Sequence, residues 1–309
     1  MEKKTYLKDT LKLNSLGLGA WPLGNTAHGK QMSIEEGADL VHEALKKGVN
    51  FFDTAPNYAY GRSETILGIA LEGKRDKVVI NSKFGHFADD TIDFSESKIR
   101  LSVNESLERL KTDYLDSLIL HNPAFEILEG KTGHFKELEA LKNEGLIKGY
   151  GVSVDTPEEV KTVMENATID VMELYFNILA QGSRDLLESI KERGIALIVK
   201  VPLDSGWLTG KYSKETTFTN IKSRWSEKDK ERREGLIDTL KTISDDPIKE
   251  VAIRFILSYD AVTTVIPGIR TKSHLEDHVR ASEKPLPETF KKRLESFYDE
   301  ALKDNPLPW

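Results

Sequence analysis

Apolar runs and amphipathic stretches alternate along almost the whole chain. Eight mostly apolar runs recur in order, as expected for strands that are buried on both faces of a sheet. These runs span residues 16–20, 49–55, 77–83, 114–121, 149–154, 170–177, 195–202 and 262–268. Stretches with the helical spacing of apolar residues separate and follow them. These stretches span residues 33–47, 63–72, 95–111, 131–145, 156–165, 183–193, 247–258 and 271–282.

The residue types at the ends of the helical stretches support these boundaries. Ser33, Ser95 and Thr156 are suited to cap helix starts, and Gly48 is suited to end a helix. Eight strand–helix units in succession predict a closed (β/α)8 TIM barrel, formed as one domain by residues 1–309. An open doubly wound sheet is the alternative, and the absence of a break in composition favours the closed barrel.

Three segments lie outside the repeat of strands and helices. Residues 5–13 predict an N-terminal hairpin that plugs the floor of the barrel. Residues 210–246 form an insertion after the seventh strand, and their charged sequence predicts an exposed helix. This insertion is either a lid or a plain solvated helix, because loops at this end of a barrel often carry function. Residues 287–309 are expected to form a C-terminal helix and tail.

Composition narrows the class of protein. A chain of 309 residues buries an ample core, and the absence of cysteine excludes disulfides and fits a cytoplasmic location. The net charge is −7 and no basic stripe occurs, so nucleic acid is not an expected partner. No apolar run reaches about 18 residues, so no membrane span is expected. A small-molecule partner is compatible with this net charge, and the sequence leaves the oligomeric state open.

Four polar side chains stand at, or just after, the ends of three successive predicted strands. They are Asp53, Tyr58, Lys83 and His121. The carboxyl ends of parallel barrel strands meet at one rim, where catalytic groups of such barrels gather. Each residue also has a structural interpretation, such as a capping aspartate or a turn histidine, but the four types together favour a site for proton transfer.

The chemistry of these four groups predicts their roles. A phenol has a pKa of about 10, and the nearby ammonium of Lys83 is expected to lower the pKa of Tyr58 toward neutrality. Asp53 is expected to pair with Lys83 and keep it protonated. His121 is expected to donate a hydrogen bond to a substrate oxygen. Tyr58 then acts as the general acid or base.

The chain resembles the aldo-keto reductases over essentially its whole length. The motifs that carry the resemblance are GLGAWPLG, FFDTAPNYAYGRSETILGIAL, KFG, SLERLKTDYLDSLILH, GVS, PLDSGWLTGK and VIPGIR. The resemblance implies a TIM barrel that binds a nicotinamide dinucleotide without a Rossmann fold. It also implies Tyr58 as proton donor, Asp53 and Lys83 as its partners, and His121 as the group that orients the carbonyl.

The resemblance further implies contacts to the cofactor and the substrate. Ser153 and Gln181 are expected to hold the nicotinamide carboxamide. The remaining expected cofactor contacts are Lys200, Pro202, Leu203, Ser205, Gly206, Leu208, Pro267, Gly268, Arg270, His274 and His278. Arg270, helped by Lys272, resembles the cation that binds a 2′-phosphate, which points to NADP(H). Trp21 is expected to form a wall of the substrate pocket, or alternatively to pack under a loop.

Three positions depart from the pattern of many relatives. Val154 stands where Asn often follows the Ser of GVS, and Asp277 lies among histidines near the adenosine end. Lys200 stands where an aromatic residue often stacks on nicotinamide, and its charge is expected to disfavour the oxidised ring. His274 and His278 have a metal-capable spacing, but no third ligand is evident, so no metal is expected.

These inferences predict an NADPH-dependent oxidoreductase that reduces aldehydes or ketones to alcohols, with Tyr58 as general acid. The alternative is an NAD(P)-dependent aldose 1-dehydrogenase, which would use the same residues in the oxidative direction. Two other classes are a Schiff-base enzyme with Lys83 or Lys200 as nucleophile, and a non-catalytic, cofactor-sensing protein. The paired state of Lys83 and the intact set of four residues argue against these two classes.

Overall fold

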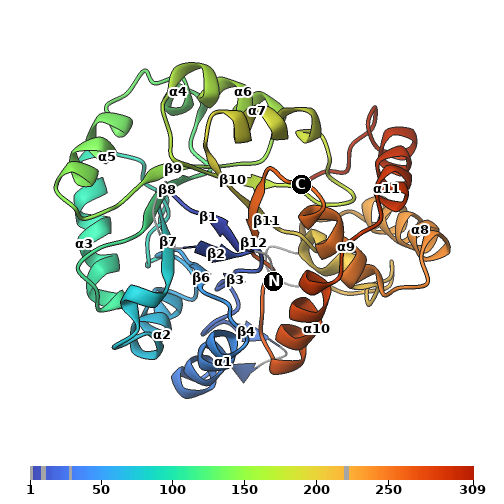
Figure 1. The fold of residues 1–309 in the computed structure, drawn as a ribbon, viewed down its shortest axis with the longest axis horizontal. Helices are drawn as coiled ribbons and strands as arrows, with labels where there is room; N and C mark the ends of the chain where they lie inside the picture. The colour runs from blue at the N-terminus through green and yellow to red at the C-terminus, as the bar shows by residue number, and fades with distance from the viewer. Residues whose placement is uncertain (1–2, 8–11, 28–29, 219–222) are drawn as a thin grey trace.

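The computed structural model describes residues 3–7, 12–27, 30–218 and 223–309. Eight parallel strands form one curled sheet, which confirms the predicted barrel class. In chain order they are β3 (Leu18–Gly19), β6 (Phe51–Asp53), β7 (Val79–Phe84), β8 (Ser117–His121), β9 (Tyr150–Val154), β10 (Val171–Tyr175), β11 (Ala196–Lys200) and β12 (Val262–Val265). Each strand pairs with the next one along the chain, so sequence order is also spatial order (Figure 1).

Contacts between the first and last strand segments close the ring. Leu16 bridges Val265, and Gly19 bridges Gly268, both in parallel orientation. A Cβ atom on Gly19 would lie 2.7 Å from the carbonyl oxygen of Ile266, so only glycine allows this approach. Closure leaves no free edge between these segments and brings all eight carboxyl ends to one rim.

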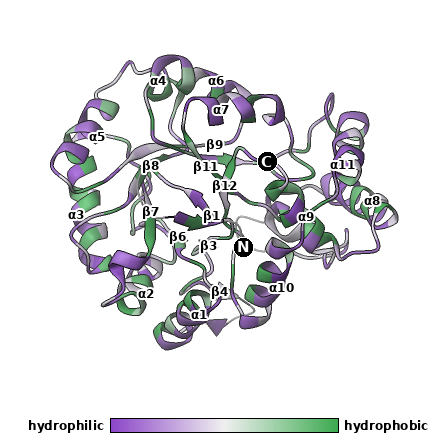
Figure 2. Ribbon diagram, viewed as in Figure 1, coloured by the Kyte–Doolittle hydropathy of each residue, from purple (hydrophilic) through white to green (hydrophobic). Residues whose placement is uncertain are grey.

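Helices surround the barrel as predicted. They are α1 (Ile34–Lys46), α2 (Arg62–Ala70), α3 (Ile99–Leu110), α5 (His134–Asn143), α6 (Pro157–Asn166), α7 (Leu187–Glu192), α9 (Ile248–Leu257) and α10 (Lys272–Glu283). Ser33 and Thr156 each form a capping box, whereas Ser95 caps no helix and precedes a short 3₁₀ turn. The helices carry both hydrophilic and hydrophobic faces (Figure 2), and their apolar faces join one large core with the strands.

A short hairpin closes the floor of the barrel. Its strands β1 (Lys3–Thr5) and β2 (Lys12–Asn14) pair antiparallel and lie within the ring in Figure 1, while residues 8–11 of the predicted 5–13 hairpin lie outside the described residues. Tyr6 is buried, packs edge-on against Phe51 and shares a 2.6 Å hydrogen bond with Ser117. These partners stand at the amino ends of their strands, so this end is the floor.

The insertion and the C-terminal segment form an extension beside the barrel. Helix α8 (Glu227–Ile243) and helix α11 (Glu288–Ala301) lie side by side there (Figure 1), and Arg232 donates to the carbonyl oxygen of Ala301. The prediction of a fully exposed helix is wrong for one face of α8. Arg233 on that face is fully buried, and its ion pair with Asp204 at 2.8 Å compensates the buried charge.

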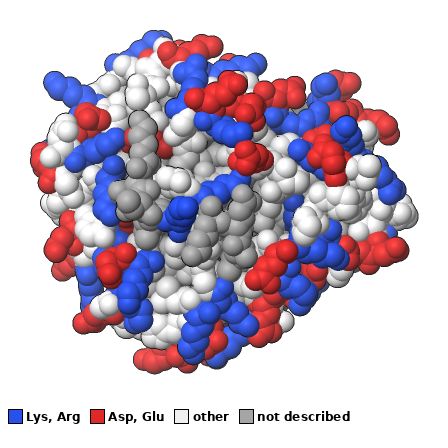
Figure 3. All heavy atoms as spheres, viewed as in Figure 1, with Lys and Arg blue, Asp and Glu red and all other residues white. Residues whose placement is uncertain are grey.

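Two short elements were not predicted from the sequence. Strands β4 (Thr26–Ala27) and β5 (Lys30–Gln31) form a two-stranded sheet after β3, and helix α4 (Phe125–Leu128) follows β8. Basic and acidic side chains are interspersed over the face shown in Figure 3. Within the described part of the chain, no helix is both long and apolar enough to cross a membrane.

Candidate active site

The structure brings Asp53 and Lys83 together inside the barrel. Both side chains are buried at the carboxyl ends of the adjacent strands β6 and β7. The Lys83 ammonium lies 2.6 Å from Asp53 Oδ1 and also donates to the carbonyl oxygen of Thr54 at 3.0 Å. Asn81 donates a second hydrogen bond of 2.7 Å to the same carboxyl oxygen. The predicted pair therefore forms, and neighbouring backbone and amide groups hold it in place.

Tyr58 and His121 complete the predicted group of four. The Tyr58 ring lies edge-on to the His121 ring with 6.1 Å between centroids, and Lys83 Nζ lies 5.1 Å from the centre of the Tyr58 ring. His86, two residues beyond β7, stacks on His121 with 4.4 Å between centroids. Three strands and the loop after β6 therefore converge on one site.

Glu173 belongs to this site and was missed by sequence reasoning. It lies in the middle of β10, is buried, and its Oε2 is 3.3 Å from Lys83 Nζ. Its other oxygen accepts a 3.1 Å hydrogen bond from Ser153 on β9. The available signal was a carboxylate inside an otherwise apolar strand, because a buried charge needs a partner.

The charges around Tyr58 have opposing effects. Burial raises the pKa of Tyr58, the ammonium of Lys83 lowers it, and Asp53 and Glu173 raise it again. With these effects combined, the pKa of Tyr58 lies above the usual value for a phenol. The prediction that Lys83 lowers this pKa toward neutrality is therefore wrong for this structure. The phenol is fully protonated near neutral pH, and this is the form that a proton donor requires.

The other titratable groups are set by the same burial. Burial lowers the pKa of Lys83, but Asp53 and Glu173 more than offset this effect, so the ammonium stays protonated. Burial and the charge of Lys83 place the pKa of His121 well below its usual value. A neutral imidazole has one N–H donor and one acceptor nitrogen. His121 Nδ1 is buried and has no hydrogen-bond partner among the described residues.

Lys200 connects the site to the next part of the rim. Its ammonium donates to Ser153 Oγ at 2.7 Å and to Asn122 Oδ1 at 2.9 Å, and lies 2.8 Å from Asp155. The carboxylate of Asp155 therefore neutralises the charge that we expected to act on an oxidised ring. The same contacts fix the Ser153 hydroxyl, which lies between Lys200 and Glu173.

Gln181 makes its own contacts apart from this group, and its predicted contact with a nicotinamide carboxamide stays a prediction. Its side-chain nitrogen donates to the carbonyl oxygens of Ile178 and Leu294, and its oxygen accepts from Arg184. The amide thus fastens the loop after β10 to helix α11. The motif placed Gln181 after a strand, but the chain turns at 176–180 before reaching it.

The segment after β11 has an unusual backbone. Asp204, Ser205 and Gly206 adopt consecutive positive φ angles of 46°, 52° and 105°. Backbone of this kind can turn N–H groups toward an anion, but the N–H groups of Asp204 and Gly206 already donate to the carbonyl oxygens of Val201 and Leu203. Of the predicted contacts here, Pro202 and Leu208 are buried and Leu203 packs against the core.

The predicted adenosine-end residues cluster at the start of α10. Arg270 donates to the carbonyl oxygens of Asn25 and Lys30, and Thr271 caps the helix. Pro267 is buried and Gly268 is exposed beside them. Burial lowers the pKa of His278 to about 4 and also lowers that of His274. In the described parts of the chain, no group of three or more acidic or histidine side chains could hold a metal ion.

Exposed aromatic groups occur on the loops that follow the strands. Trp21 lies two residues after β3 and is 48% exposed, so it does not pack under a loop. Trp309 at the end of the tail stacks on Tyr175, at the end of β10, with 4.2 Å between ring centroids. These rings lie on segments that border the rim and offer apolar surface to a ligand.

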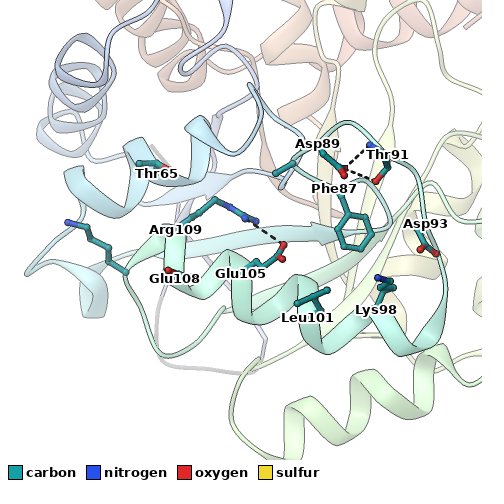
Figure 4. A pocket seen from close by; sticks show the side chains of 12 residues that line it. Thr65, Phe87, Asp89, Thr91, Asp93, Lys98, Leu101, Glu105, Glu108 and Arg109 are labelled. Atoms are coloured by element: carbon teal, nitrogen blue, oxygen red, sulfur yellow. Dashed lines mark hydrogen bonds and ion pairs between the residues drawn. The ribbon is translucent and has the colours of Figure 1, made fainter.

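A separate cavity lies on the outer surface. It measures about 780 Å³ and is bordered by α2, α3 and the loop after β7 (Figure 4). Its lining mixes both charges, including Asp93, Lys98 and Glu108, and contains none of the four predicted catalytic residues. The cavity is therefore distinct from the rim where the buried ionic group lies.

A tyrosine, a lysine, an aspartate and a histidine lie together at the carboxyl rim of a closed parallel barrel. This arrangement is typical of a class of barrel oxidoreductases. Residues 15–299 match the model of the aldo/keto reductase family. The chain belongs to this family of oxidoreductases, whose members use a nicotinamide cofactor.

Individual relatives extend the comparison. The chain is 30% identical over 280 residues to L-galactose dehydrogenase of Arabidopsis thaliana, covering 88% of this chain and 85% of the relative. It is 27% identical over 305 residues to NADH-specific methylglyoxal reductase of Escherichia coli (strain K12), covering 90% and 93%. The solved structure of aldo-keto reductase AKR11C1 from Bacillus halodurans in its holo form matches with a TM-score of 0.82 and 26% identity, covering 98% and 97%.

Proposed function

We propose that the protein reduces aldehydes or ketones to alcohols with NADPH, and that Tyr58 is the general acid. The observation that carries the proposal is the convergence of Tyr58, Lys83, Asp53 and His121 at the rim. Lys83 lies 2.6 Å from Asp53 and 5.1 Å from the Tyr58 ring centre. This arrangement supplies a protonated phenol next to a fixed positive charge.

When bound, a nicotinamide cofactor would supply a hydride for the carbonyl carbon of the substrate. The protein supplies the proton, because Tyr58 is protonated near neutral pH and gives its hydroxyl proton to the carbonyl oxygen. Lys83 then stabilises the phenolate that remains, since an ammonium at this distance favours the charged form. His121 is neutral and donates a hydrogen bond that orients the same oxygen.

Three features support the fit of a phosphorylated dinucleotide. The left-handed backbone at Ser205 suits a pyrophosphate. The N-terminus of α10, with Arg270 and the exposed Lys272 beside it, suits a 2′-phosphate. Two nitrogens of Arg270 donate to backbone carbonyl oxygens, and its guanidinium has further N–H groups that can donate to an anion.

Oxidation of an aldose at its first carbon is the second candidate. The 30% identity to L-galactose dehydrogenase over most of both chains favours it. The same residues serve this direction, with Tyr58 as the base. A Schiff-base mechanism at Lys83 is disfavoured, because two carboxylates keep the amine protonated and so not nucleophilic.

Nicotinamide absorbance provides the test. Purified protein is mixed with NADPH and a panel of aldehydes and ketones, and separately with NADP⁺ and a panel of aldoses. NADH and NAD⁺ are run in parallel. We expect turnover with NADPH and at least one activated aldehyde. Binding of NADPH without turnover on any substrate would indicate a cofactor-sensing protein instead.

A further inference from the structure

Two buried carboxyl groups face a single ammonium at the centre of the site. Asp53 from β6 and Glu173 from β10 approach Lys83 Nζ at 2.6 and 3.3 Å, and all three side chains are at most 3% exposed. A buried carboxylate is costly unless its charge is compensated. One ammonium compensates one carboxylate, so the second carboxyl group is the unusual feature of this cluster.

The two carboxyl groups also affect each other. Their side chains interact, and the interaction raises the pKa of Asp53 and lowers that of Glu173. Two ionised carboxylates have no donor for each other, so a hydrogen bond between them would require one proton. Ser153 donates to Glu173 and Lys200 lowers its pKa, whereas Asp53 Oδ1 accepts from the Lys83 ammonium and from the neutral amide of Asn81.

We propose that Glu173 is a positioning residue of the active site, and that it shares one proton with Asp53 across Lys83. It acts through Lys83 and Ser153 rather than by touching the reacting atoms. The positioning role of Glu173 rests on the proposed function, whereas the shared proton does not depend on cofactor or substrate. Its consequence is a cluster that is neutral overall while Asp53 holds the proton.

The surroundings determine when this proton leaves. Burial and the charge of Glu173 raise the pKa of Asp53 to about 8, while Lys83 lowers it. Burial opposes ionisation of Glu173, but Lys83 and Lys200 lower its pKa overall. The other titratable groups that face the cluster are Tyr58, His121, His86 and Tyr6. Above the transition the cluster gains a negative charge, which raises the pKa of Tyr58 further.

Infrared absorbance of protonated carboxyl groups, measured in a pH titration of the protein without cofactor, tests the proposal. We expect the wild-type protein to lose one such group between about pH 7 and pH 9. The Asp53→Asn variant should lack this transition, and in the Glu173→Gln variant it should move to lower pH. The Glu64→Gln variant is the matched control, because Glu64 is also buried but pairs with Arg109 on the outer side of the barrel.

A wild-type protein with no carboxyl group titrating above about pH 6 would overturn the proposal, even if every variant failed to fold. An unchanged transition in Glu173→Gln would overturn it as well. The positioning role has its own readout, the pH profile of kcat/KM. Glu173→Gln should move an apparent pKa near 8 to lower pH by about one unit or more, because a like charge is removed. Since the titration uses no cofactor, it can fail while the reductase assay succeeds, and the reverse.

Discussion

Two buried ionic clusters lie at opposite ends of the barrel and have opposite stoichiometry. At the floor, Asp116 lies 2.7 Å from Arg75 and 2.9 Å from Lys148, so two cations surround one carboxylate. At the rim, Lys83 lies between two carboxyl groups. The floor cluster joins the amino ends of neighbouring strands, and its charge is more than compensated. The rim cluster holds one carboxyl group more than its single ammonium compensates.

The difference between the two clusters shows that the rim, and not the floor, is the end of the barrel where functional groups lower the stability of the fold. The cations of the floor cluster reach solvent, since Lys148 is 41% exposed, so their charge costs little. The rim cluster is almost completely dry, and its ammonium is fully buried. Such an arrangement is expensive to build, and strongly perturbed groups of this kind concentrate at functional sites.

The largest expected effect comes from Tyr58→Phe, which removes the proton donor from the rim and leaves every member of both ionic clusters in place. We expect kcat to fall by about 10²- to 10⁴-fold, the usual contribution of a general acid. Cofactor affinity and thermal stability should change little. Turnover is followed by NADPH absorbance, and binding by quenching of tryptophan fluorescence. A variant with full turnover would remove Tyr58 from the acid role.

Lys83→Met should have the next largest effect, and it tests the rim cluster directly. The substitution leaves Asp53 and Glu173 without a cation, and breaking a buried pair in this way costs about 3–5 kcal/mol. The free energy of unfolding from urea titration measures the loss. The loss should be smaller at about pH 5 than at pH 9, because the carboxyl groups take up protons instead. Equal losses at both pH values would contradict the account.

The sequence predicted the fold and the four catalytic candidates because those signals are local. Apolar runs, capping residues and polar groups at strand ends each depend on a few neighbouring residues. Glu173 was missed because its partner Lys83 lies 90 positions away, on a strand separated from β10 in the sheet order. The contact of Gln181 with α11 could not be predicted, because it depends on a turn that the motif does not record. The buried face of α8 depends on Asp204, which lies 29 positions before Arg233.

Asp53→Asn separates the stability cost of the rim cluster from its charge. In the folded protein the pKa of Asp53 is raised from about 4 to about 8, so the folded state holds a proton that the unfolded state has lost. Wild-type stability from this group is therefore complete below about pH 4 and is lost as pH rises toward 8. The neutral amide keeps a donor for Glu173 and has no such loss.

The expected result is a growing advantage of Asp53→Asn over the wild type between about pH 5 and pH 8, with a slope of up to about 1.4 kcal/mol per pH unit. Urea titrations at four pH values measure it. The Tyr58→Phe variant is the control, since it removes no group that titrates in this range. A constant difference at all pH values would mean that Asp53 is ionised throughout.

The smallest effect is expected at the floor, where Lys148→Met removes an ammonium from an ionic cluster just as Lys83→Met does at the rim. Asp116 keeps its 2.7 Å pair with Arg75 and its hydrogen bond from the Ile80 amide, so no buried charge is left without a partner. The free energy of unfolding should fall by about 0–1 kcal/mol, as for other exposed ion pairs, and turnover should not change. Parallel urea titrations of the two lysine variants give the comparison, and a loss as large as that of Lys83→Met would show that the two clusters do not differ in kind.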